Sequence, residues 1–511
     1  MKEMLPTALH QALFYWANKQ PQHPFLLAEP ALCYRQSANY VSALATQLSG
    51  SQRVAIWLEK NNHYALSILA TLSAGACYIP IDSKQPINRV DLILTDAQAD
   101  TLIVDDKHLL LVGPLLAKYP QLKVVLIGEK NAQQAANTSF FDWRLHLETE
   151  QAHASEPWHK NSLAAVLFTS GSTGRPKGVQ LTLGNIQHFV SWCQNNMSLD
   201  CSDRFLNLAS FNFDLSTFDL FVCLAVGGSL YIANDDAPKQ PMTLANVLSE
   251  HQITVMYCVP SLLNLMNRIG LWQQAEALAL QHLIFAGEVM PKPCLKGLAS
   301  ALPNTHFYNF YGPTETNVCL AYKVTEEDIL NNEPIAIGLP IGDTQAWLID
   351  EQGNPVTNES GAMGELVIQG SCVTPGYCLE SQKLANHALQ IHSTGDIARY
   401  HNGQYYYHGR CDRMVKISGF RVELGEIEAC LLAHPQISEV AVRYCANTSK
   451  LIASYALNDA QSKLGTLALK TYSAQHLPTY MIPHKFECFG TLPKNANGKI
   501  DYPTLAQVND E

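Results

Sequence analysis

The chain has 511 residues, of which 47% are hydrophobic and 15% are charged, so it can bury a large core and is not an intrinsically disordered chain. It carries 34 lysines and arginines against 45 aspartates and glutamates, a formal net charge of −11. An acidic surface repels phosphate backbones, so nucleic acid is not expected as a partner.

The first half of the chain alternates short apolar runs with helical patterns. Residues 54–58, 77–81, 102–104 and 124–127 are predicted strands, and residues 63–74 have helical spacing. Alternation of strands and helices is typical of parallel sheets covered by helices. We therefore expect an α/β fold with a large N-terminal core of stacked, helix-covered sheets.

The pattern changes after the residues GRCDR at 409–413. It then predicts a helix, two strands, a second helix and a last strand, at residues 425–433, 439–444, 451–457, 464–476 and 485–489. A unit of about a hundred residues is large enough to fold alone. We therefore expect a core over residues 1–411 and a small α+β lid over residues 412–511, with a hinge between them.

Membrane and secretion signals are not recognisable in the sequence. No apolar run approaches the ~20 residues of a membrane span, and the N-terminus lacks the apolar region of a signal peptide. The 14 cysteines show no C-x-x-C pair and no zinc spacing. We expect a soluble, cytoplasmic protein with reduced thiols and no membrane partner.

Residues 168–178 read FTSGSTGRPKG and follow an apolar, strand-like run at residues 163–167. Glycines and small hydroxyl residues offer N–H and O–H donors to an anion, and Lys177 adds a positive charge. The composition alone is also typical of a flexible surface loop. A Walker A loop is excluded, because Lys177 lies between Pro176 and Gly178 and does not follow a glycine.

This segment resembles the phosphate loop of the adenylate-forming enzymes, a superfamily that includes acyl-CoA synthetases, luciferases and the adenylation domains of nonribosomal peptide synthesis. Other segments resemble further motifs of that superfamily in the same order, at residues 70–82, 309–316, 364–377, 393–396, 409–412, 416–428 and 493–501. The resemblance covers nearly the whole chain. It implies the superfamily's fold and two cofactors, ATP and Mg²⁺.

The resemblance also implies roles for individual residues. In the phosphate loop, the nucleotide-binding residues would be Thr169, Ser170, Gly171, Ser172, Thr173, Gly174 and Lys177. Elsewhere, ATP- or AMP-binding residues would be Asn309, Tyr311, Gly312, Thr314, Asp396 and Arg410. Tyr311 would lie against the adenine, and Asp396 would accept both ribose hydroxyls. The catalytic residues would be Glu315, which would also bind Mg²⁺, and Lys499 of the lid.

Adenylation brings a carboxylate and a phosphate together, so the site must neutralise charge before the carboxylate attacks. The flexible ammonium of Lys499 suits a charge that a moving lid brings in. For the second half-reaction, the resemblance implies that the lid rotates about Asp412 and that Gly419 lines the path of a phosphopantetheine arm. The chain shows no carrier-protein motif, so we expect a stand-alone peptidyl carrier protein as the partner.

The sequence FNFDLSTFD at residues 211–219 discriminates between substrate classes. Members that activate amino acids carry an aspartate at the place of Asp214, because an ammonium next to the reacting carboxylate needs a buried counter-ion. A helix-capping aspartate is the structural alternative. The pocket positions of the family read, in order, Asp214, Leu215, Phe218, Tyr257, Ile284, Ala286, Phe310, Val318, Cys319 and Lys499.

Between its two charged ends this lining is apolar or aromatic, so we expect a small apolar amino acid. The lining is similar to that of stand-alone ligases that load L-proline on a carrier protein in pyrrole antibiotic pathways, which makes L-proline the expected substrate. D-Alanine–carrier protein ligases share the FDLS stretch but typically have cysteine in place of Ala286. The alternatives are a D-alanine–carrier protein ligase, an acyl-CoA synthetase and a non-enzymatic binding protein. Asp214 argues against the acyl-CoA synthetase. Intact Lys499, Glu315 and Asp396 argue against the non-enzymatic binding protein.

Overall fold

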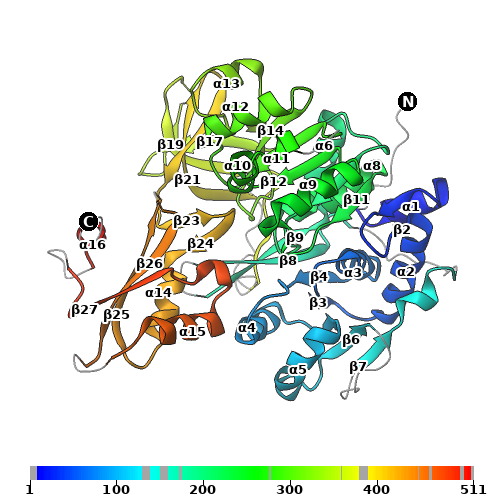
Figure 1. The fold of residues 1–511 in the computed structure, drawn as a ribbon, viewed down its shortest axis with the longest axis horizontal. Helices are drawn as coiled ribbons and strands as arrows, with labels where there is room; N and C mark the ends of the chain where they lie inside the picture. The colour runs from blue at the N-terminus through cyan, green and yellow to red at the C-terminus, as the bar shows by residue number, and fades with distance from the viewer. Residues whose placement is uncertain are drawn as a thin grey trace. The chain divides into compact units, whose positions relative to one another are not determined.

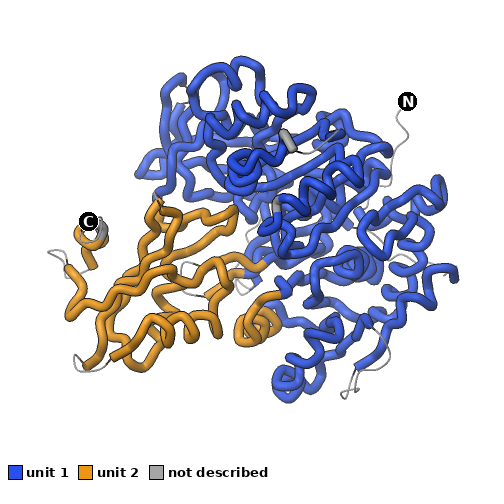
Figure 2. Tube along the Cα trace, in the orientation of Figure 1, with its two compact units in different colours: residues 1–83, 96–167, 178–411 blue, residues 84–95, 168–177, 412–511 orange. Residues whose placement is uncertain are grey.

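The structure is a computed structural model of the chain, and it describes residues 9–128, 138–149, 159–171, 175–274, 278–357, 359–378, 390–446, 448–459, 463–494 and 500–507. Two compact units are present (Figure 2). The first comprises residues 1–83, 96–167 and 178–411, and the second comprises residues 84–95, 168–177 and 412–511. The last boundary between them therefore falls between Cys411 and Asp412.

The first unit contains two large sheets (Figure 1). In the described residues, one has nine strands in the order β16-β15-β14-β13-β12-β10-β11-β1-β2 and the other has eight in the order β20-β9-β8-β4-β3-β5-β6-β7. The nine strands are Leu339–Pro340, Leu320–Lys323, His306–Tyr311, His282–Ala286, Val255–Cys258, Arg204–Asn207, Ser229–Ile232, Pro24–Leu26 and Leu32–Cys33. The eight are Gly376–Tyr377, Lys177–Thr182, Leu163–Thr169, Cys77–Pro80, Arg53–Trp57, Thr101–Val104, Lys123–Ile127 and Thr138–Phe141.

The inner strands of both sheets run parallel. β10 to β14 pair in parallel, as do β3, β4, β5 and β6, whereas antiparallel pairs lie toward the sheet edges. β3 is apolar and buried from Val54 to Trp57, as expected for a strand covered on both faces. The predicted parallel, helix-covered sheets are therefore confirmed.

Helices connect these strands. Those of eight or more residues are α1 (Gln11–Lys19), α2 (Tyr34–Gln47), α3 (Asn62–Ser73), α4 (Ile87–Ala97), α5 (Asp106–Lys118), α6 (Leu183–Asn196), α9 (Pro241–Glu250), α10 (Pro260–Arg268) and α12 (Lys292–Ala301). Shorter ones are α7 (Leu215–Thr217), a π-helix (Phe218–Val222), α8 (Cys223–Val226), α11 (Leu271–Gln274) and α13 (Glu326–Leu330), with 3₁₀ turns at Trp143–His146 and Ala237–Lys239.

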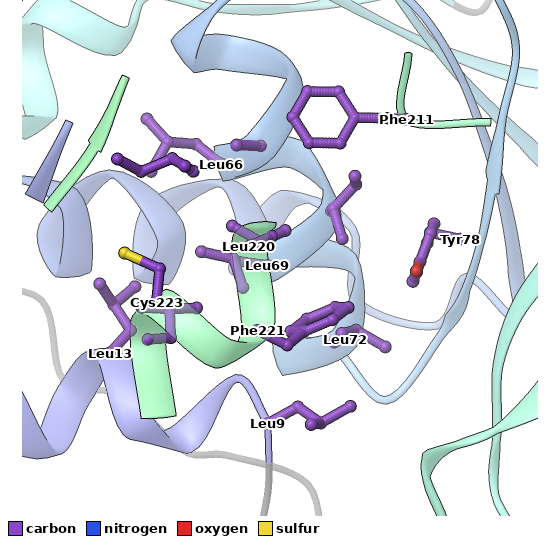
Figure 3. Close-up of a cluster of buried hydrophobic side chains, with 14 of the residues drawn as sticks. Leu9, Leu13, Leu66, Leu69, Leu72, Tyr78, Phe211, Leu220, Phe221 and Cys223 are labelled. Atoms are coloured by element: carbon purple, nitrogen blue, oxygen red, sulfur yellow. The ribbon is translucent and has the colours of Figure 1, made fainter. Parts of the chain in front are cut away.

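Helix α3 belongs to the core that joins the two sheets. Every one of its residues except His63 is buried, which is typical of a helix that is covered all round. Its leucines lie with Leu220, Phe221 and Cys223 of the π-helix and α8 in one cluster (Figure 3). The same cluster contains β3 residues of the eight-stranded sheet and β11 residues of the nine-stranded sheet.

The first unit ends in a smaller antiparallel sheet. Its strands in the described residues are β18 (Pro355–Val356), β17 (Gln345–Ile349), β19 (Met363–Gln369), β21 (Ile391–His401) and β22 (Gln404–Arg410). Within the described ranges of the whole chain, no helix combines the length and the hydropathy that a membrane span requires.

The C-terminal stretch of the second unit is an α+β arrangement. A hairpin of β23 (Met414–Ile417) and β24 (Phe420–Glu423) precedes a sheet of β25 (Ile437–Cys445), β26 (Lys450–Leu457) and β27 (Lys485–Phe489). Its helices are α14 (Leu424–Leu432), α15 (Thr466–His476) and α16 (Tyr502–Gln507), with a 3₁₀ turn at Thr479–Met481. The predicted order of helix, two strands, helix and strand is confirmed to within a few residues at each end.

Candidate active site

The carboxyl ends of four parallel strands meet at one edge of the nine-stranded sheet. β14, β13, β12 and β10 are neighbours in that order, and their register places Tyr257 beside Ile284 and Ala286 beside Phe310. In open α/β sheets, ligands bind at the carboxyl ends of the strands. Several predicted pocket residues therefore share the edge at which a ligand site is expected.

Three aromatic side chains predicted to line the amino-acid pocket, Phe218, Tyr257 and Phe310, pack against one another. All three are fully buried, and their ring centroids lie 5.4, 5.8 and 6.2 Å apart. The ring planes are inclined at 70° to 79°, the edge-to-face arrangement that aromatic pairs prefer. We refer to these rings as the aromatic trio. The same cluster contains the predicted lining residues Ile284, Ala286 and Val318, with Leu215 packed against it.

Cys319 lies outside this cluster. It packs with Tyr311 and Leu320 in a second cluster, and its thiol donates to the Tyr311 carbonyl oxygen at 3.5 Å. Burial raises the pKa of the Cys319 thiol, which therefore stays protonated. The structure therefore brings Val318, and not Cys319, together with the aromatic trio.

Asp214 is half-buried at the start of helix α7. It holds the N-cap position, yet its side chain makes no capping hydrogen bond; its carbonyl oxygen accepts from the Thr217 amide at 2.9 Å and the Thr217 hydroxyl at 2.6 Å. Burial and, after it, the negative charge of Asp214 raise the pKa of Tyr257. The carboxylate of Asp214 therefore has no capping role and lies near enough to the aromatic trio to affect its one ionisable ring.

Tyr311 follows Phe310 on β14, so the two side chains point to opposite faces of the strand. The Tyr311 hydroxyl donates to Asp396 Oδ2 at 2.5 Å, and Arg410 Nη1 donates to Asp396 Oδ1 at 2.5 Å. Burial and the Asp396 charge hold the pKa of Tyr311 well above its usual range, so the hydroxyl remains a donor. A carboxylate can accept about four hydrogen bonds, which leaves Asp396 acceptor capacity for ribose hydroxyls.

The smaller antiparallel sheet supplies this ion pair. Asp396 on β21 and Arg410 at the end of β22 are direct cross-strand partners, and only 2% of the Asp396 side chain and 7% of the Arg410 side chain are exposed. The pairing register shifts between Ile397 and Ala398, directly beyond Asp396. Such irregularities redirect side chains and are common next to active sites.

Glu315 lies in the turn that follows β14. Its side chain is fully buried, its Oε1 accepts from the Tyr377 hydroxyl at 2.7 Å, and its carbonyl oxygen accepts from the Thr374 amide at 2.7 Å. Carboxylate oxygen is a ligand that Mg²⁺ prefers, and Mg²⁺ commonly takes one or two protein carboxylates besides phosphates and waters. No group of three potential His, Cys, Asp or Glu ligands occurs among the described residues. The Glu315 carboxylate has the oxygen chemistry that suits such an ion.

Asn309, Gly312 and Thr314 belong to the same strand end and turn. Asn309 Nδ2 donates to the Ala336 carbonyl oxygen at 2.8 Å. Gly312 is required by space, because a Cβ there would come within 1.7 Å of the Asn317 carbonyl oxygen. The Asn317 amide in turn donates to the Thr314 carbonyl oxygen at 3.3 Å. These contacts fix the backbone that carries the predicted nucleotide-binding residues.

The described part of the predicted phosphate loop belongs to the second unit. Ser170 Oγ donates to the Arg421 carbonyl oxygen at 2.6 Å, and the Gly171 amide donates to Glu426 Oε2 at 2.9 Å. An amide that was predicted to bind phosphate thus binds another anion, a carboxylate. Thr169 ends β8 and Lys177 begins β9. The predicted site residues Ser172, Thr173, Gly174 and Lys499 lie outside the described residues.

Two predicted residues remain. Asp412 lies just before the β23–β24 hairpin, and Gly419 lies in its turn. Asp412 Oδ1 accepts from the Met414 amide at 3.1 Å. Ser418 and Gly419 form the two-residue turn, with φ of +50° and +81°. Positive φ at both positions is what a type I′ hairpin turn requires, which explains the glycine by backbone geometry.

Sequence reasoning missed two residues that contact the segments in which the predicted site residues lie. Tyr377 donates to Glu315, and Asn207, at the carboxyl end of β10, donates to the buried Asp219 Oδ2 at 2.9 Å. Tyr377 is the last residue of the family-like motif at residues 364–377. The signal for Asn207 was an amide side chain directly after the apolar pair Phe205 and Leu206, at the end of the strand Arg204–Asn207.

The sequence matches the family described as AMP-binding enzyme over residues 13–378 and the AMP-binding enzyme C-terminal domain over residues 426–499. It is 40% identical to an L-proline–[L-prolyl-carrier protein] ligase of Streptomyces coelicolor, over 94% of this chain and 93% of that protein. A protein of the same name from Pseudomonas fluorescens is 33% identical, over 98% of this chain and 99% of that protein.

A solved structure shares the fold. The Vibrio cholerae adenylation domain AlmE, determined in complex with glycyl-adenosine-5'-phosphate, superposes with a TM-score of 0.83 at 22% sequence identity. The superposition covers 100% of this chain and 99% of that one, so the similarity extends over both the large N-terminal part and the small C-terminal part.

Proposed function

The chain belongs to the AMP-binding family of adenylate-forming enzymes and is an amino acid–carrier protein ligase, and we propose that the amino acid it activates is L-proline. A ligase of this family uses ATP and forms AMP. The carboxylate oxygen of the amino acid bonds to the α-phosphorus of ATP while the bond to pyrophosphate breaks. A thiol of the carrier protein then bonds to the aminoacyl carbon while the bond to AMP breaks, and the thiol proton is released.

The combination of the Asp214 carboxylate with the buried aromatic trio carries the assignment of L-proline. An ammonium group next to the reacting carboxylate needs a counter-ion, and a half-buried carboxylate supplies it. The ring of proline offers three methylenes, each worth ~0.8 kcal/mol when fully buried, to a surface of flat aromatic rings. Its secondary ammonium still has two N–H donors, so one can bind Asp214. The names of the two relatives at 40% and 33% identity support the same substrate.

The nucleotide would bind on the other face of β14. Asp396 would accept the ribose hydroxyls, Arg410 would hold Asp396 and reach toward the phosphates, and Tyr311 would lie against the adenine. Glu315 would hold a Mg²⁺ ion, which supplies positive charge to the phosphates when it is bound. Phe310 and Tyr311 are consecutive, so the amino acid and the nucleotide would meet at the end of one strand.

Residues 412–511 would act as the lid, with Asp412 as the hinge. In the adenylation state the lid would bring the Lys499 ammonium to the two anions, where it offsets their repulsion. In the thioester-forming state it would present Gly419 to the phosphopantetheine arm. The partner in that step would be a separate peptidyl carrier protein.

The test is amino-acid-dependent exchange of labelled pyrophosphate into ATP, with each of the twenty protein amino acids and D-alanine. We expect L-proline to give the highest kcat/KM and mass spectrometry to show a prolyl thioester on a carrier protein. Selectivity should be sharper against larger residues such as L-phenylalanine than against smaller ones, because steric exclusion exceeds the ~1–3 kcal/mol of a missing methylene. D-Alanine matching L-proline would overturn the substrate assignment, and exchange with no amino acid would overturn the amino-acid site.

A further inference from the structure

Asn207 closes the chain segment that carries Asp214. Its Nδ2 donates to the Ala209 carbonyl oxygen at 3.1 Å and to Asp219 Oδ2 at 2.9 Å. One amide group therefore joins the two ends of residues 209–219, and Asp214 lies in the middle of this stretch. The side chains of Asn207 and Asp219 are 0% and 1% exposed, so water does not compete for these hydrogen bonds.

Lys60 holds the backbone at the start of the same segment. It lies between β3 and α3, and its Nζ donates to the carbonyl oxygens of Asn207 at 3.2 Å, Leu208 at 3.0 Å and Ala233 at 2.7 Å. An ammonium has three N–H donors and no acceptor, so it can satisfy three carbonyl oxygens at once. Lys60 is buried, and burial lowers its pKa to about 8. A buried charge with these partners fixes the end of β10 and the end of β11.

Helix α3 also packs against residues of this segment. The ring of Tyr64 stacks on Phe211 with centroids 4.9 Å apart and an interplanar angle of 20°. Figure 3 shows Phe211 together with Leu220 and Phe221 around α3. The segment that carries Asp214 is therefore held at its ends by polar contacts and along its length by the core.

We propose that Asn207, oriented by Lys60, is a positioning residue that sets the place of the Asp214 carboxylate and so the affinity for the amino acid. This inference rests on the proposed role of Asp214 in binding the substrate ammonium. The segment 209–219 carries Asp214 and Phe218 but none of the residues proposed to bind ATP. Loss of the Asn207 contacts should therefore weaken amino-acid binding and leave ATP binding unchanged.

The first test is Asn207→Leu, which keeps the side-chain volume and removes the donor. In pyrophosphate exchange we expect the KM for L-proline to rise about 10- to 100-fold, the effect of displacing a binding group by about 1 Å, with the KM for ATP unchanged. The matched control is Asn62→Leu. Asn62 is also buried, and its Nδ2 donates to the carbonyl oxygens of Ala28 at 2.7 Å and Pro30 at 2.9 Å. The control should lose thermal stability with no selective change in the KM for L-proline.

Two substitutions at Asp219 separate the effect of the hydrogen bond from the effect of the charge. They also test the proposal if the Asn207→Leu variant does not fold. Burial raises the pKa of Asp219 to about 8, so the carboxyl is largely protonated at neutral pH and an amide resembles it. Asp219→Asn keeps an oxygen acceptor for Asn207 and should retain the wild-type KM for L-proline. Asp219→Leu removes the acceptor and should raise that KM as Asn207→Leu does.

The proposal is overturned if the folded Asn207→Leu variant keeps its KM for L-proline, if the KM values for L-proline and ATP change together, or if Asp219→Asn and Asp219→Leu have the same KM for L-proline.

Failure of the proposed substrate is distinguishable from failure of this inference. If another amino acid supports the highest exchange, the same comparison of its KM with that of ATP is made with that amino acid. If Asp214→Asn leaves the amino-acid KM unchanged, the ammonium site itself fails.

Discussion

The two aspartates of the candidate site, Asp214 and Asp396, differ in their surroundings. Asp396 is buried and holds two donors, the Tyr311 hydroxyl and the Arg410 guanidinium. Asp214 is half-buried at a helix start beside apolar rings, where its charge raises the pKa of Tyr257. Removing the Asp214 charge should therefore weaken binding of the amino acid, and removing the Asp396 charge should weaken binding of ATP.

Asp214→Asn should raise the KM for the amino acid by at least ~30-fold and leave the KM for ATP unchanged, because removing one partner of a desolvated charge pair costs ~2–5 kcal/mol of binding. The amide keeps the shape of the side chain and removes only its charge. Steady-state pyrophosphate exchange with each substrate varied in turn measures both constants. Equal KM values in variant and wild type would show that Asp214 does not bind the ammonium.

Asp396→Asn should have the opposite pattern, with a raised KM for ATP and an unchanged KM for the amino acid. The substitution leaves the buried Arg410 guanidinium without its counter-charge, so we also expect a loss of ~3–5 kcal/mol in unfolding free energy. Tyr311→Phe is the control, since it removes a hydrogen bond to the same carboxylate and keeps both charges. An amino-acid KM that rises as much as the ATP KM would contradict this division of the site.

At the scale of elements, strand β14 separates the two halves of the site. Phe310 belongs to the cluster of the aromatic trio, and Tyr311 belongs to the cluster next to the smaller sheet. This division follows from the period of two of any strand. The neighbouring strand β13 shows the same alternation, because Ala286 lies in the cluster of the aromatic trio and Phe285 lies in a different one.

Phe310→Ala should enlarge the amino-acid pocket and shift its selectivity. We expect the ratio of kcat/KM for L-phenylalanine to that for L-proline to rise, and unfolding free energy to fall by ~3–5 kcal/mol because a fully buried ring is lost. Phe285→Ala is the matched control: it removes an equally buried ring on β13 that lies outside the cluster of the aromatic trio. A similar shift in selectivity in the control would show that the effect is not specific to the aromatic trio.

At the scale of the whole molecule, the proposed chemistry is divided between two units. The residues proposed to bind the amino acid and the nucleoside, Asp214 and Asp396 among them, belong to the first unit. The proposed hinge Asp412 and the lid residues that follow it belong to the second. A reaction with two half-reactions can use one binding unit with a lid that changes its place between them.

Lys499→Ala should abolish formation of the aminoacyl adenylate while retaining most of the thioester formation from supplied prolyl-adenylate. The Lys499 ammonium is needed only while two anions approach each other. Pyrophosphate exchange measures the first half-reaction, and mass spectrometry of the carrier protein measures the second. Lys494→Ala is the matched control, because Lys494 lies in the same motif at residues 493–501 and pairs with Glu439 at 2.6 Å. Equal loss of both half-reactions would contradict a role confined to adenylation.

The sequence by itself determined the elements and the chemical class of the protein. The strand at residues 54–58, the helix at residues 63–74 and the C-terminal order of elements follow from apolar spacing, which depends on near neighbours in the chain. Membership of the family was predicted from ordered motifs and is shown by the match over residues 13–378. The candidate carboxylates were also named from their motifs.

Only the tertiary structure decided which of these residues meet. The separation of Cys319 from the aromatic trio, the pairing of Asp396 with Arg410 and the contacts of Lys60 with residues at the ends of β10 and β11 depend on strand order and register. Lys60 and Leu208 are 148 residues apart in the chain, and no local pattern encodes such a contact. Periodicity fixes the face on which a side chain lies, whereas its partner is fixed by the packing of distant elements.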